Sequence, residues 1–397
     1  MPNLVSLGPD GTFITPENPV IPIITGDGIG PELWRSARPV LDAAVARSGH
    51  APIVWLETPA GEKALAETGE YLPASTLATL REHRVSLKGP LATPVGGGLR
   101  SLNVAIRKEL DLYACLRPVR WIPGGPSPVK NPEKMNIMIF RENTEDVYAG
   151  LEWPAGSPEA EELSRFAAEH CGAAIRPRSA LGLKPMSEFG SKRLIRMAFK
   201  WALDHKAPSL TLVHKGNIMK FTEGAFRAWG YEVAREEFGA LTVTEAEAEG
   251  RDGRLVIKDR IADNMFMQSL LRPDEYSVLA MPNLNGDYLS DALAAQIGGL
   301  GLAPGANLGD GLAVFEATHG TVPKYIGQDK VNPGSLILSG ALMLEYMGWP
   351  EAAEKVRTAV ARTIAAGLFT YDLARQAPGA TEVSTSAFGR AVTENIN

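Results

Sequence analysis

The sequence predicts an α/β fold, in which strands and helices alternate along the chain. A short apolar run at Val20–Ile24 is typical of a buried strand, and it leads through a glycine turn into a helix. The helix is indicated by apolar residues at helical spacing, namely Leu33, Ala37, Leu41 and Val45. Strand and helix patterns continue to alternate through residues 50–120, which favours a sheet covered by helices.

Length and composition describe an ordinary globular protein. A chain of 397 residues can bury a large core and ordinarily divides into two or more lobes. The 45% hydrophobic and 22% charged residues are typical of soluble proteins. A net charge of −6 argues against nucleic acid or a membrane as partner, and no segment approaches the ~20 apolar residues of a membrane span. With only Cys115 and Cys171 and no export signal, we expect the reducing cytoplasm, or an organelle matrix if a presequence has been lost.

The glycine turn after the first strand lacks a dinucleotide-binding fingerprint. Its glycines, Gly26, Gly28 and Gly30, follow the pattern G-x-G-x-G and not G-x-G-x-x-G. No acidic residue ends a second strand cleanly at the expected distance of ~20 residues. We therefore expect only a tight connection between a strand and a helix.

Three arginines indicate an anion-binding pocket. Arg117 and Arg141 occur with apolar strand patterns, where a cation is costly unless an anion pairs with it. Arg107 lies about two turns into a helix whose positively polarised start would contain Ser101, a plausible cap, and Asn103. Each arginine alone is more simply a structural ion pair. Together, beside the serine and the asparagine, they predict a pocket for a small polycarboxylate.

Two further side chains are candidates for acid–base chemistry. Tyr148 follows Arg141 closely, and a tyrosine among cations is expected to favour its phenolate form. Lys215 ends the strand pattern Ser209–His214, where it is either solvated or a base in a pocket. Between these candidates the composition changes, and residues 152–186, with strand candidates at 173–175 and 180–183, predict an inserted, exposed subregion.

Paired aspartates indicate a divalent-metal site. Asp287 and Asp291 lie four residues apart, where a loop with Gly286 is expected to become a helix. The two Cβ atoms would then be roughly 5–6 Å apart on one face, and a hard cation such as Mg²⁺ would relieve the repulsion. An isolated pair is more simply a solvated acidic turn, but an apolar stripe and the glycine-rich loop Gly298–Gly301 favour the metal. A third aspartate, Asp263, follows another apolar run.

Several segments form a pattern that runs nearly from end to end: Gly26–Glu32, Lys88–Pro94, Ser101–Pro118, Phe140–Gly150, His214–Gly224, Asn283–Gly299 and Phe315–Asn332. The most specific of them is the aspartate motif Asn285–Asp291. The pattern resembles the bacterial, NADP-dependent isocitrate dehydrogenases, in the family that also contains isopropylmalate dehydrogenase. The resemblance implies an isocitrate/isopropylmalate dehydrogenase-like α/β fold with a mixed sheet, not a Rossmann domain, in an obligate homodimer.

The resemblance also implies a division of the chain. The large domain would combine residues 1–112 with 298–397, and the small domain with the dimer interface would combine 113–145 with 188–297. Residues 146–187 would form a clasp between subunits.

The implied reaction is the oxidative decarboxylation of isocitrate to 2-oxoglutarate and CO₂, with reduction of NADP and with Mg²⁺ or Mn²⁺. Tyr148, assisted by Lys215, would be catalytic and would reprotonate the substrate carbon after CO₂ leaves. The positions that match isocitrate-binding residues are Ser101, Asn103, Arg107, Arg117, Arg141 and Asn217.

The same resemblance predicts active sites shared between two subunits. Asp287 and Asp291 match metal ligands from one subunit, and Asp263 matches the ligand from the other. Lys215 and Asn217 match residues that reach into the partner's site. Each constellation would therefore be incomplete within one chain.

The C-terminal third carries most of the predicted NADP site. Phe315–Tyr325 resembles the family's adenosine loop, and NAD-using relatives tend to place an acid where Lys324 stands. In NADP-using relatives the matching positions that clasp the 2′-phosphate are Lys324, Tyr325, Tyr371 and Arg375. The full set of implied cofactor contacts is Lys88, Thr93, Glu316, His319, Gly320, Lys324, Tyr325, Val331, Asn332, Tyr371 and Arg375. Ala92 departs from the pattern, because a threonine is usual there, and one hydroxyl near the cofactor is missing.

Other functions are less well supported. A related decarboxylase could act on isopropylmalate or homoisocitrate. Ser101 and Asn103 count against isopropylmalate, because its branched alkyl group would prefer apolar neighbours. A Mg²⁺-dependent phosphoryl or prenyl transferase would need a P-loop or a second acidic cluster on a facing helix. A non-catalytic binding protein would not need the full set of chemical residues. Ser101 also matches a position that a dedicated kinase phosphorylates in some relatives, so a regulatory kinase is a further candidate partner.

Overall fold

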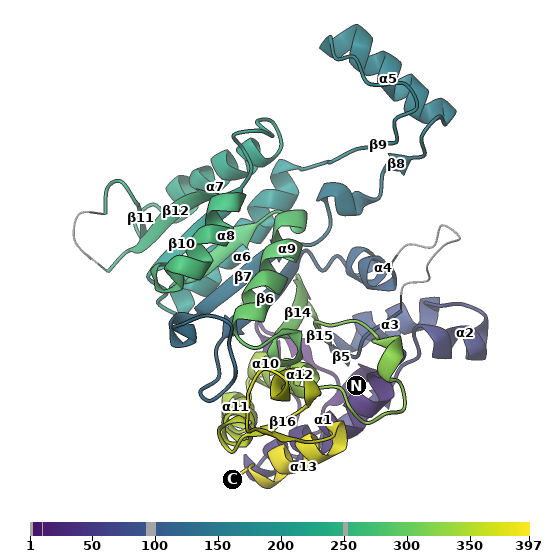
Figure 1. Ribbon diagram of the computed structural model, residues 1–397, viewed down its shortest axis with the longest axis vertical. Coiled ribbons are helices and arrows are strands. Elements are labelled where there is room, and N and C mark those ends of the chain that lie inside the picture. The colour runs from purple at the N-terminus through teal and green to yellow at the C-terminus, as the bar shows by residue number, and fades with distance from the viewer. Residues whose placement is uncertain (1–2, 10, 93–100, 249–252) are drawn as a thin grey trace.

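The computed structural model describes residues 3–9, 11–92, 101–248 and 253–397 (Figure 1). Its strands are β1 (Ser6–Leu7), β2 (Phe13–Ile14), β3 (Val20–Ile24), β4 (Val54–Glu57), β5 (Val85–Lys88), β6 (Ala114–Arg120), β7 (Asn136–Glu142), β8 (Glu152–Trp153), β9 (Leu181–Gly182), β10 (Ser209–His214), β11 (Thr242–Thr244), β12 (Leu255–Ile261), β13 (Val278–Met281), β14 (Pro304–Gly309), β15 (Leu312–Ala317), β16 (Leu368–Phe369) and β17 (Thr381–Glu382). Its α-helices are α1 (Gly30–Arg47), α2 (Glu62–Thr68), α3 (Ala74–His83), α4 (Leu102–Glu109), α5 (Pro158–Cys171), α6 (Glu188–Asp204), α7 (Glu223–Glu237), α8 (Ala262–Leu271), α9 (Asn283–Gln296), α10 (Gly334–Tyr346), α11 (Pro350–Ala365), α12 (Tyr371–Ala374) and α13 (Thr385–Glu394).

A single eleven-stranded sheet runs through the described residues, in the order β11-β12-β10-β13-β7-β6-β14-β15-β5-β3-β4. Neighbouring strands are parallel from β11 to β7 and again from β15 to β4. The pairs between β7, β6, β14 and β15 are antiparallel. This confirms the predicted mixed sheet, which differs from the mostly parallel sheet of a Rossmann domain.

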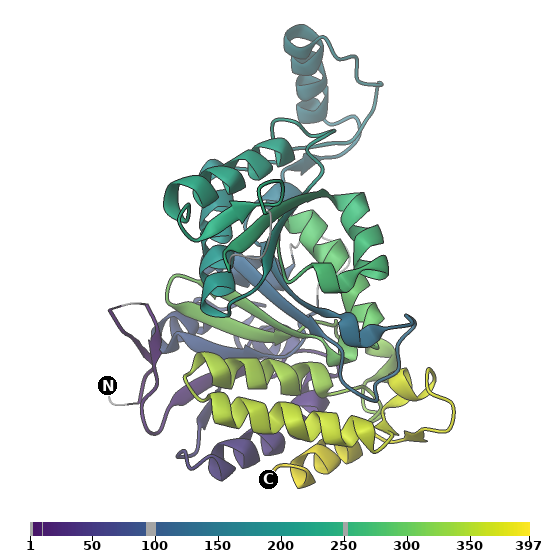
Figure 2. The ribbon, with the colours of Figure 1, turned by 90° about the vertical axis from the view of Figure 1, so that its left-hand side faces the viewer.

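Helices cover the half of the sheet that contains both chain ends. Figure 2 shows α10, α11 and α13 stacked beside this half, with α1 among them. Helix α10 is buried along almost its whole length because it lies between the sheet and the other helices. A Cβ atom on Gly340 would lie 2.6 Å from the methyl carbons of Leu41 on α1, so the two helices approach closely at this glycine.

The other half of the sheet is covered on both faces. Helices α6 and α7 contribute to the same apolar core as α1 and α10. Helices α8 and α9 form a separate apolar cluster with β6, β7, β10 and β13. Helix α9, which carries the aspartate motif, therefore packs beside the strands that carry two of the predicted arginines.

The glycine turn between β3 and α1 is tight, as expected. Gly26 and Gly28 have positive φ angles of 83° and 60°, a conformation that glycine adopts without strain. The buried carboxylate of Asp27 accepts hydrogen bonds of 2.8 Å from the backbone N–H groups of Glu62 and Ala92. The turn thus holds the segment that follows β5 beside the candidate site.

Two local predictions are wrong. Residues 173–175 form no strand; they follow α5, which projects from the body of the molecule with β8 and β9 (Figure 1). Helix α9 begins at Asn283, one turn before the expected start, so Gly286 lies within its first turns.

The proposed division into large domain, small domain and clasp stays a prediction. The sheet is continuous across the predicted boundary between the domains. Among the described residues, no helix is long and apolar enough to cross a membrane.

Candidate active site

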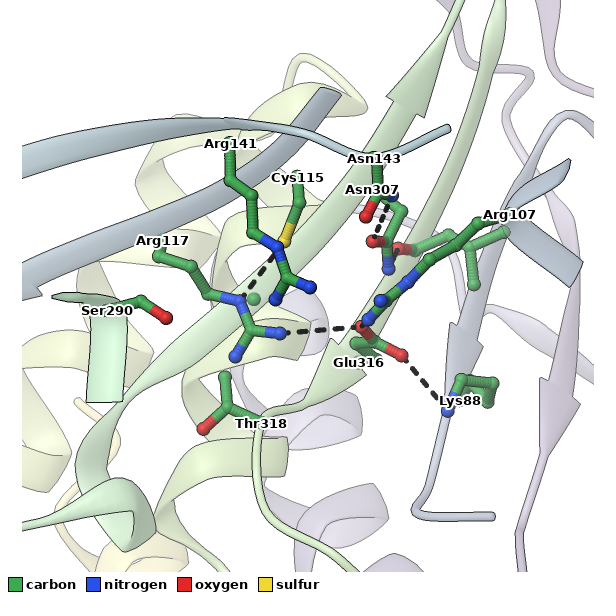
Figure 3. Close-up of polar contacts among 12 residues, drawn as sticks. Lys88, Arg107, Cys115, Arg117, Arg141, Asn143, Ser290, Asn307, Glu316 and Thr318 are labelled. Carbon is green, nitrogen blue, oxygen red and sulfur yellow. Dashed lines mark hydrogen bonds and ion pairs between the residues drawn. The ribbon is translucent and has the colours of Figure 1, made fainter. Parts of the chain in front are cut away.

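The centre of the candidate site is the carboxylate of Glu316, near the end of β15. Three buried cations approach it (Figure 3). Lys88 Nζ lies 3.1 Å from its Oε2 atom, and Arg107 donates a hydrogen bond of 2.7 Å to Oε1. A guanidinium nitrogen of Arg117 lies 3.7 Å from the same Oε1 atom. One anion therefore faces three cations from β5, α4 and β6.

This imbalance controls the ionisation of the cluster. Burial opposes ionisation of Glu316, but Lys88, Arg107 and Arg117 together hold its pKa well below the usual range. Burial lowers the pKa of Lys88, although Glu316 counteracts the shift. With all four groups charged, the cluster keeps an excess of two positive charges in a desolvated place. Such an excess is a strong attractor for an anionic ligand.

A buried pair of asparagines supports the cluster from the antiparallel strands. Asn143 donates hydrogen bonds to the backbone oxygen of Leu112 at 2.9 Å and to Asn307 Oδ1 at 3.0 Å. Asn307 in turn donates to the backbone oxygen of Val314 on β15. These bonds connect the strands that carry Glu316 and Arg141, although the Oδ1 atom of Asn143 is buried without a partner among the described residues.

Arg141 connects the cluster to helix α9. Its Nε atom donates to Asn283 Oδ1 at 2.9 Å, and its Nη1 atom lies 2.5 Å from Asp287 Oδ1. Its other terminal nitrogen is buried and has no hydrogen-bond partner among the described residues. A Cβ atom on Gly286 would lie 2.5 Å from Cγ of Arg141, so this helix position needs glycine for the approach.

Tyr148 belongs to the same group of side chains. Its hydroxyl donates to Asp287 Oδ2 at 2.6 Å, and the guanidinium carbon of Arg141 lies 5.0 Å from its ring centre. The expectation that its phenolate form is favoured is wrong. Burial and the hydrogen bond to Asp287 raise the pKa of Tyr148 to about 12, because both favour the protonated form. Tyr148 is therefore arranged as a proton donor.

The two aspartates of α9 have different environments. Burial opposes ionisation of Asp287, but the charge of Arg141 and the Tyr148 hydroxyl lower its pKa. Asp291 is exposed, yet partial desolvation raises the pKa of its carboxyl, and the charge of Asp287 adds to the shift. In the described structure, its carboxylate accepts one long hydrogen bond of 3.5 Å from the hydroxyl of Ser290. A divalent cation fits these two carboxylates, because it would neutralise the repulsion and take Asp291 as a hard oxygen ligand.

The third predicted metal ligand lies elsewhere in the chain. Asp263, at the start of α8, is exposed and forms an ion pair with Lys215 after β10. Asn217 is exposed in the same segment. Among the described residues, no three carboxylate, imidazole or thiolate groups are close enough to hold a metal ion. One chain therefore brings together Asp287 and Asp291, and it leaves Asp263 and Lys215 as a separate pair.

A cavity of about 350 Å³ opens over the cation cluster. Its wall includes Asn103, Arg107 and Arg117 from the predicted substrate set. The predicted cofactor residues on the same wall are Lys88, Glu316, His319 and Gly320. Ala92 also lines this cavity, which therefore lacks the hydroxyl that a threonine at this position would supply. The two predicted sets thus meet in one place.

The start of helix α4 lies at this cavity. Ser101 occupies the N-cap position, as expected, but its side chain forms no capping hydrogen bond in the described structure. The Oδ1 atom of Asn103 is buried without a hydrogen-bond partner there. His319 also lines the cavity. Burial lowers its pKa, and its buried Nε2 atom has no hydrogen-bond partner among the described residues. Thr93 lies outside the described residues. Unpartnered polar atoms at a cavity are suited to bind a polar ligand.

The predicted 2′-phosphate residues form a second cluster. The rings of Tyr325 and Tyr371 lie 4.9 Å apart, with an interplanar angle of 58°. Lys324 lies 5.4 Å from the ring centre of Tyr325, and Arg375 lies 5.9 Å from that of Tyr371. Lys330, which the sequence analysis did not select, lies near both rings.

Val331 and Asn332 follow this second cluster and are buried. Asn332 donates to a carboxylate oxygen of Asp372 at 3.1 Å. That contact connects the loop that precedes α10 with helix α12, which carries Tyr371.

Sequence reasoning also missed a buried network beneath the Lys215 segment. Glu223, at the start of α7, accepts hydrogen bonds from the backbone N–H of Lys215 at 2.5 Å and from the side chain of Asn285 at 2.8 Å. Lys184 forms ion pairs with Glu223, at 3.0 Å, and with Asp146. These residues are far apart in sequence and follow no periodic pattern, so no local signal could have grouped them.

Known proteins match this chain over almost its whole length. A profile of the family described as isocitrate/isopropylmalate dehydrogenase matches residues 20–392. A protein of Archaeoglobus fulgidus named isocitrate dehydrogenase (NADP) is 57% identical over 393 residues, which cover 98% of this chain and 95% of that protein. Proteins of the same name from Haloferax volcanii and Staphylococcus aureus are 54% and 52% identical, covering 97% and 99% of this chain and 94% and 99% of their own lengths.

Solved structures agree with these sequence matches. The crystal structure of isocitrate dehydrogenase from Methylococcus capsulatus superposes with a TM-score of 0.80 at 36% identity, covering 95% of this chain and 99% of that one. The protein TT0538 from Thermus thermophilus superposes with a TM-score of 0.82 at 32% identity, covering 99% of this chain and 72% of that one.

The cation cluster yields a test of stability. We expect Glu316→Gln to lower the free energy of unfolding by about 3–5 kcal/mol at neutral pH, because buried cations lose their counter-ion. The folded-state pKa of Glu316 is depressed, so its contribution is present above the carboxyl pKa of the unfolded chain and is lost as pH falls through the folded pKa. Urea unfolding of wild type and variant should therefore differ most near neutrality and converge in acid.

The control for that measurement is Glu57→Gln, which alters an exposed pair with Lys63. It should change stability by less than about 1 kcal/mol. An equally small loss in Glu316→Gln would contradict a central role for the Glu316 carboxylate.

Proposed function

The chain belongs to the isocitrate/isopropylmalate dehydrogenase family, and from this premise we infer that it oxidises and decarboxylates isocitrate to 2-oxoglutarate and CO₂ while reducing NADP. The observation that carries the inference is the nearly full-length match, at 52–57% identity, to proteins named isocitrate dehydrogenase (NADP). The excess of buried positive charge around Glu316 supports the same substrate class, because isocitrate is a tricarboxylate.

Substrate binding is assigned to the cation cluster and the start of α4. Arg107 and Arg117 already share Glu316 and keep spare donors toward the cavity. Arg141 has a buried nitrogen without a described partner. Guanidinium groups with fixed planes suit bidentate binding of carboxylates. Ser101 and Asn103 complete this set, and Asn217 is assigned to the partner's site.

The bound cofactors supply the redox and Lewis-acid chemistry: the nicotinamide accepts hydride, and a divalent Mg²⁺ or Mn²⁺ ion polarises the substrate's hydroxyl and carbonyl oxygens. Asp287 and Asp291 would hold the ion. The arginines hold the carboxylates, so that the reacting carbon is oriented before the reaction. The cavity wall that joins Arg117 to His319 and Gly320 would place the nicotinamide beside the substrate.

Tyr148 is assigned the final proton transfer. Its raised pKa keeps the hydroxyl protonated at neutral pH, and its bond to Asp287 orients it. The loss of CO₂ leaves a carbon that must gain a proton, and a positioned phenol can donate it. Lys215 is the assigned assistant, acting from the other subunit.

A homodimer with shared sites accounts for the separate pair of Lys215 and Asp263. Both side chains are at least partly exposed, and Asp263 does not group with Asp287 and Asp291 among the described residues of one chain. The large apolar side chains of Ile218 and Phe221 in the same segment are 70% and 94% exposed. Such exposure favours burial against another copy of the chain.

The NADP contacts are assigned to the residues around Tyr325 and Tyr371, together with Lys88, Glu316, His319, Gly320, Val331 and Asn332. Thr93 keeps its assignment from the sequence. A cytoplasmic location and a regulatory kinase that acts on Ser101 stay predictions.

A direct assay tests the function. Formation of NADPH, followed by absorbance, should require isocitrate and Mg²⁺ or Mn²⁺, and a chelator should abolish it. NAD should serve much less well, and isopropylmalate, homoisocitrate and diphosphate substrates should give little or no turnover. Efficient use of isopropylmalate in place of isocitrate would overturn the substrate assignment.

A second prediction concerns Ser101. We expect Ser101→Asp to abolish isocitrate binding and to leave NADP binding largely intact, because it puts a negative charge where a substrate carboxylate binds. Calorimetric titration with each ligand measures both effects, with Ser101→Ala as a control without the charge. Near-normal isocitrate affinity in the Asp variant would contradict the position of the pocket.

A third prediction concerns the shared sites. Tyr148→Phe and Lys215→Met homodimers should each be nearly inactive. A mixed dimer would hold one site with both residues intact, so mixing the two variants should restore part of the activity. Native mass spectrometry would establish the subunit exchange, and exchanged subunits without recovered activity would argue against sharing.

A further inference from the structure

The surface around Tyr325 and Tyr371 holds one cation more than the sequence analysis selected. Lys330 Nζ lies 5.6 Å from the ring centre of Tyr325 and 5.2 Å from that of Tyr371. Lys324 and Arg375 each lie near only one of the two rings. Lys330 is therefore the cation that lies near both tyrosines.

The cations of this surface have no carboxylate partner in the part of the chain that the structure describes. In the described residues, Lys324, Lys330 and Arg375 form no ion pair with a carboxylate. Asp372 is close by, but its carboxylate accepts hydrogen bonds from Thr370 at 2.6 Å and from Asn332 at 3.1 Å. The contacts of Lys330 with the rings involve neutral partners, so they hold the ammonium group in place and leave its charge available.

The backbone next to Lys330 is held from two sides. Glu32 on α1 accepts hydrogen bonds from the backbone N–H groups of Gly327, at 2.5 Å, and Asp329, at 3.2 Å. The carboxylate of Asp329 accepts from the backbone N–H of Ser386, at 2.8 Å, and from its hydroxyl, at 2.5 Å.

Asp329 itself has a left-handed backbone, with a φ of 50°. Aspartate adopts this conformation more readily than most residues, because its short polar side chain can form local hydrogen bonds. The hydrogen bonds of Glu32 and Asp329 therefore hold the turn from which Lys330 extends.

We propose that Lys330 is a third cation for the 2′-phosphate of NADP and that it contributes to the choice of NADP over NAD. The proposal rests on the proposed function and adds a specificity-determining residue to it. A 2′-phosphate is close to a dianion with three acceptor oxygens, and three cations with two phenol hydroxyls supply matching donors. The ribose of NAD carries only neutral hydroxyls at this place, so it gains nothing from Lys330.

The test compares wild type with Lys330→Met by calorimetric titration of two fragments, adenosine 2′,5′-bisphosphate and 5′-AMP. In the variant, the bisphosphate should bind on the order of 10-fold more weakly, as expected for one lost cation at a partly exposed phosphate. Binding of 5′-AMP should be unchanged. With saturating isocitrate, KM for NADP should rise by a similar factor, while kcat and the KM for NAD should stay constant.

Two controls separate a specific contact from a general charge effect. Lys330→Arg keeps the charge and should retain most of the bisphosphate affinity. Arg390→Met removes an exposed cation of α13 whose charge helps to lower the pKa of Asp329. This variant should bind both fragments with unchanged affinity.

The outcomes distinguish this proposal from the function on which it rests. If wild type prefers the bisphosphate strongly and Lys330→Met binds it equally well, the role of Lys330 is overturned and NADP use stands. If wild type binds both fragments alike, the NADP assignment itself fails. If Lys330→Met weakens both fragments equally, the lysine supports the loop structurally and the proposed phosphate contact is wrong.

Discussion

The rest of the candidate site depends on a buried cluster of three cations whose charge one carboxylate neutralises only in part. Glu316 is the single anion among Lys88, Arg107 and Arg117, and all four are buried where β5, α4, β6 and β15 converge. Without the carboxylate, the three buried cations would destabilise the folded protein. With it, the fold is stable and two positive charges remain. The same arrangement thus keeps the site folded and keeps it attractive to a ligand with several carboxylates.

The second part of the site, formed by Arg141, Tyr148 and the aspartates of α9, adjoins this excess of positive charge. Arg141 extends the positive region to α9, where it holds Asp287 in the ionised form and leaves Asp291 with little support. The close approach needs Gly286, which lies against the side chain of Arg141. Candidate anion-binding and cation-binding groups are therefore neighbours, as the proposed reaction would require. Tyr148 lies between them as a protonated donor.

The chain has a third group of charged residues that does not join this site. Lys215 and Asp263 pair with each other at the surface, and Glu223 fixes the backbone of Lys215 to Asn285 at the start of α9. In a dimer with shared sites, Lys215 would act in the partner's site. The network would then connect Lys215 with α9, the helix that carries Asp287 and Asp291. The surface around Tyr325 and Tyr371 follows a similar principle, because the carboxylates of Glu32 and Asp329 hold the loop that carries Lys330.

The sequence by itself determined the α/β alternation, the strands Val20–Ile24 and Ser209–His214, and the family to which the chain belongs, because apolar spacing and motif residues are local properties. The tertiary structure decided what these residues do to one another. It paired Arg107 and Arg117 with a glutamate some two hundred residues away, reversed the expected ionisation of Tyr148, and added Lys330, Asn307 and Glu223. Burial and long-range charge pairing exist only after distant strands have met, and a pKa depends on both.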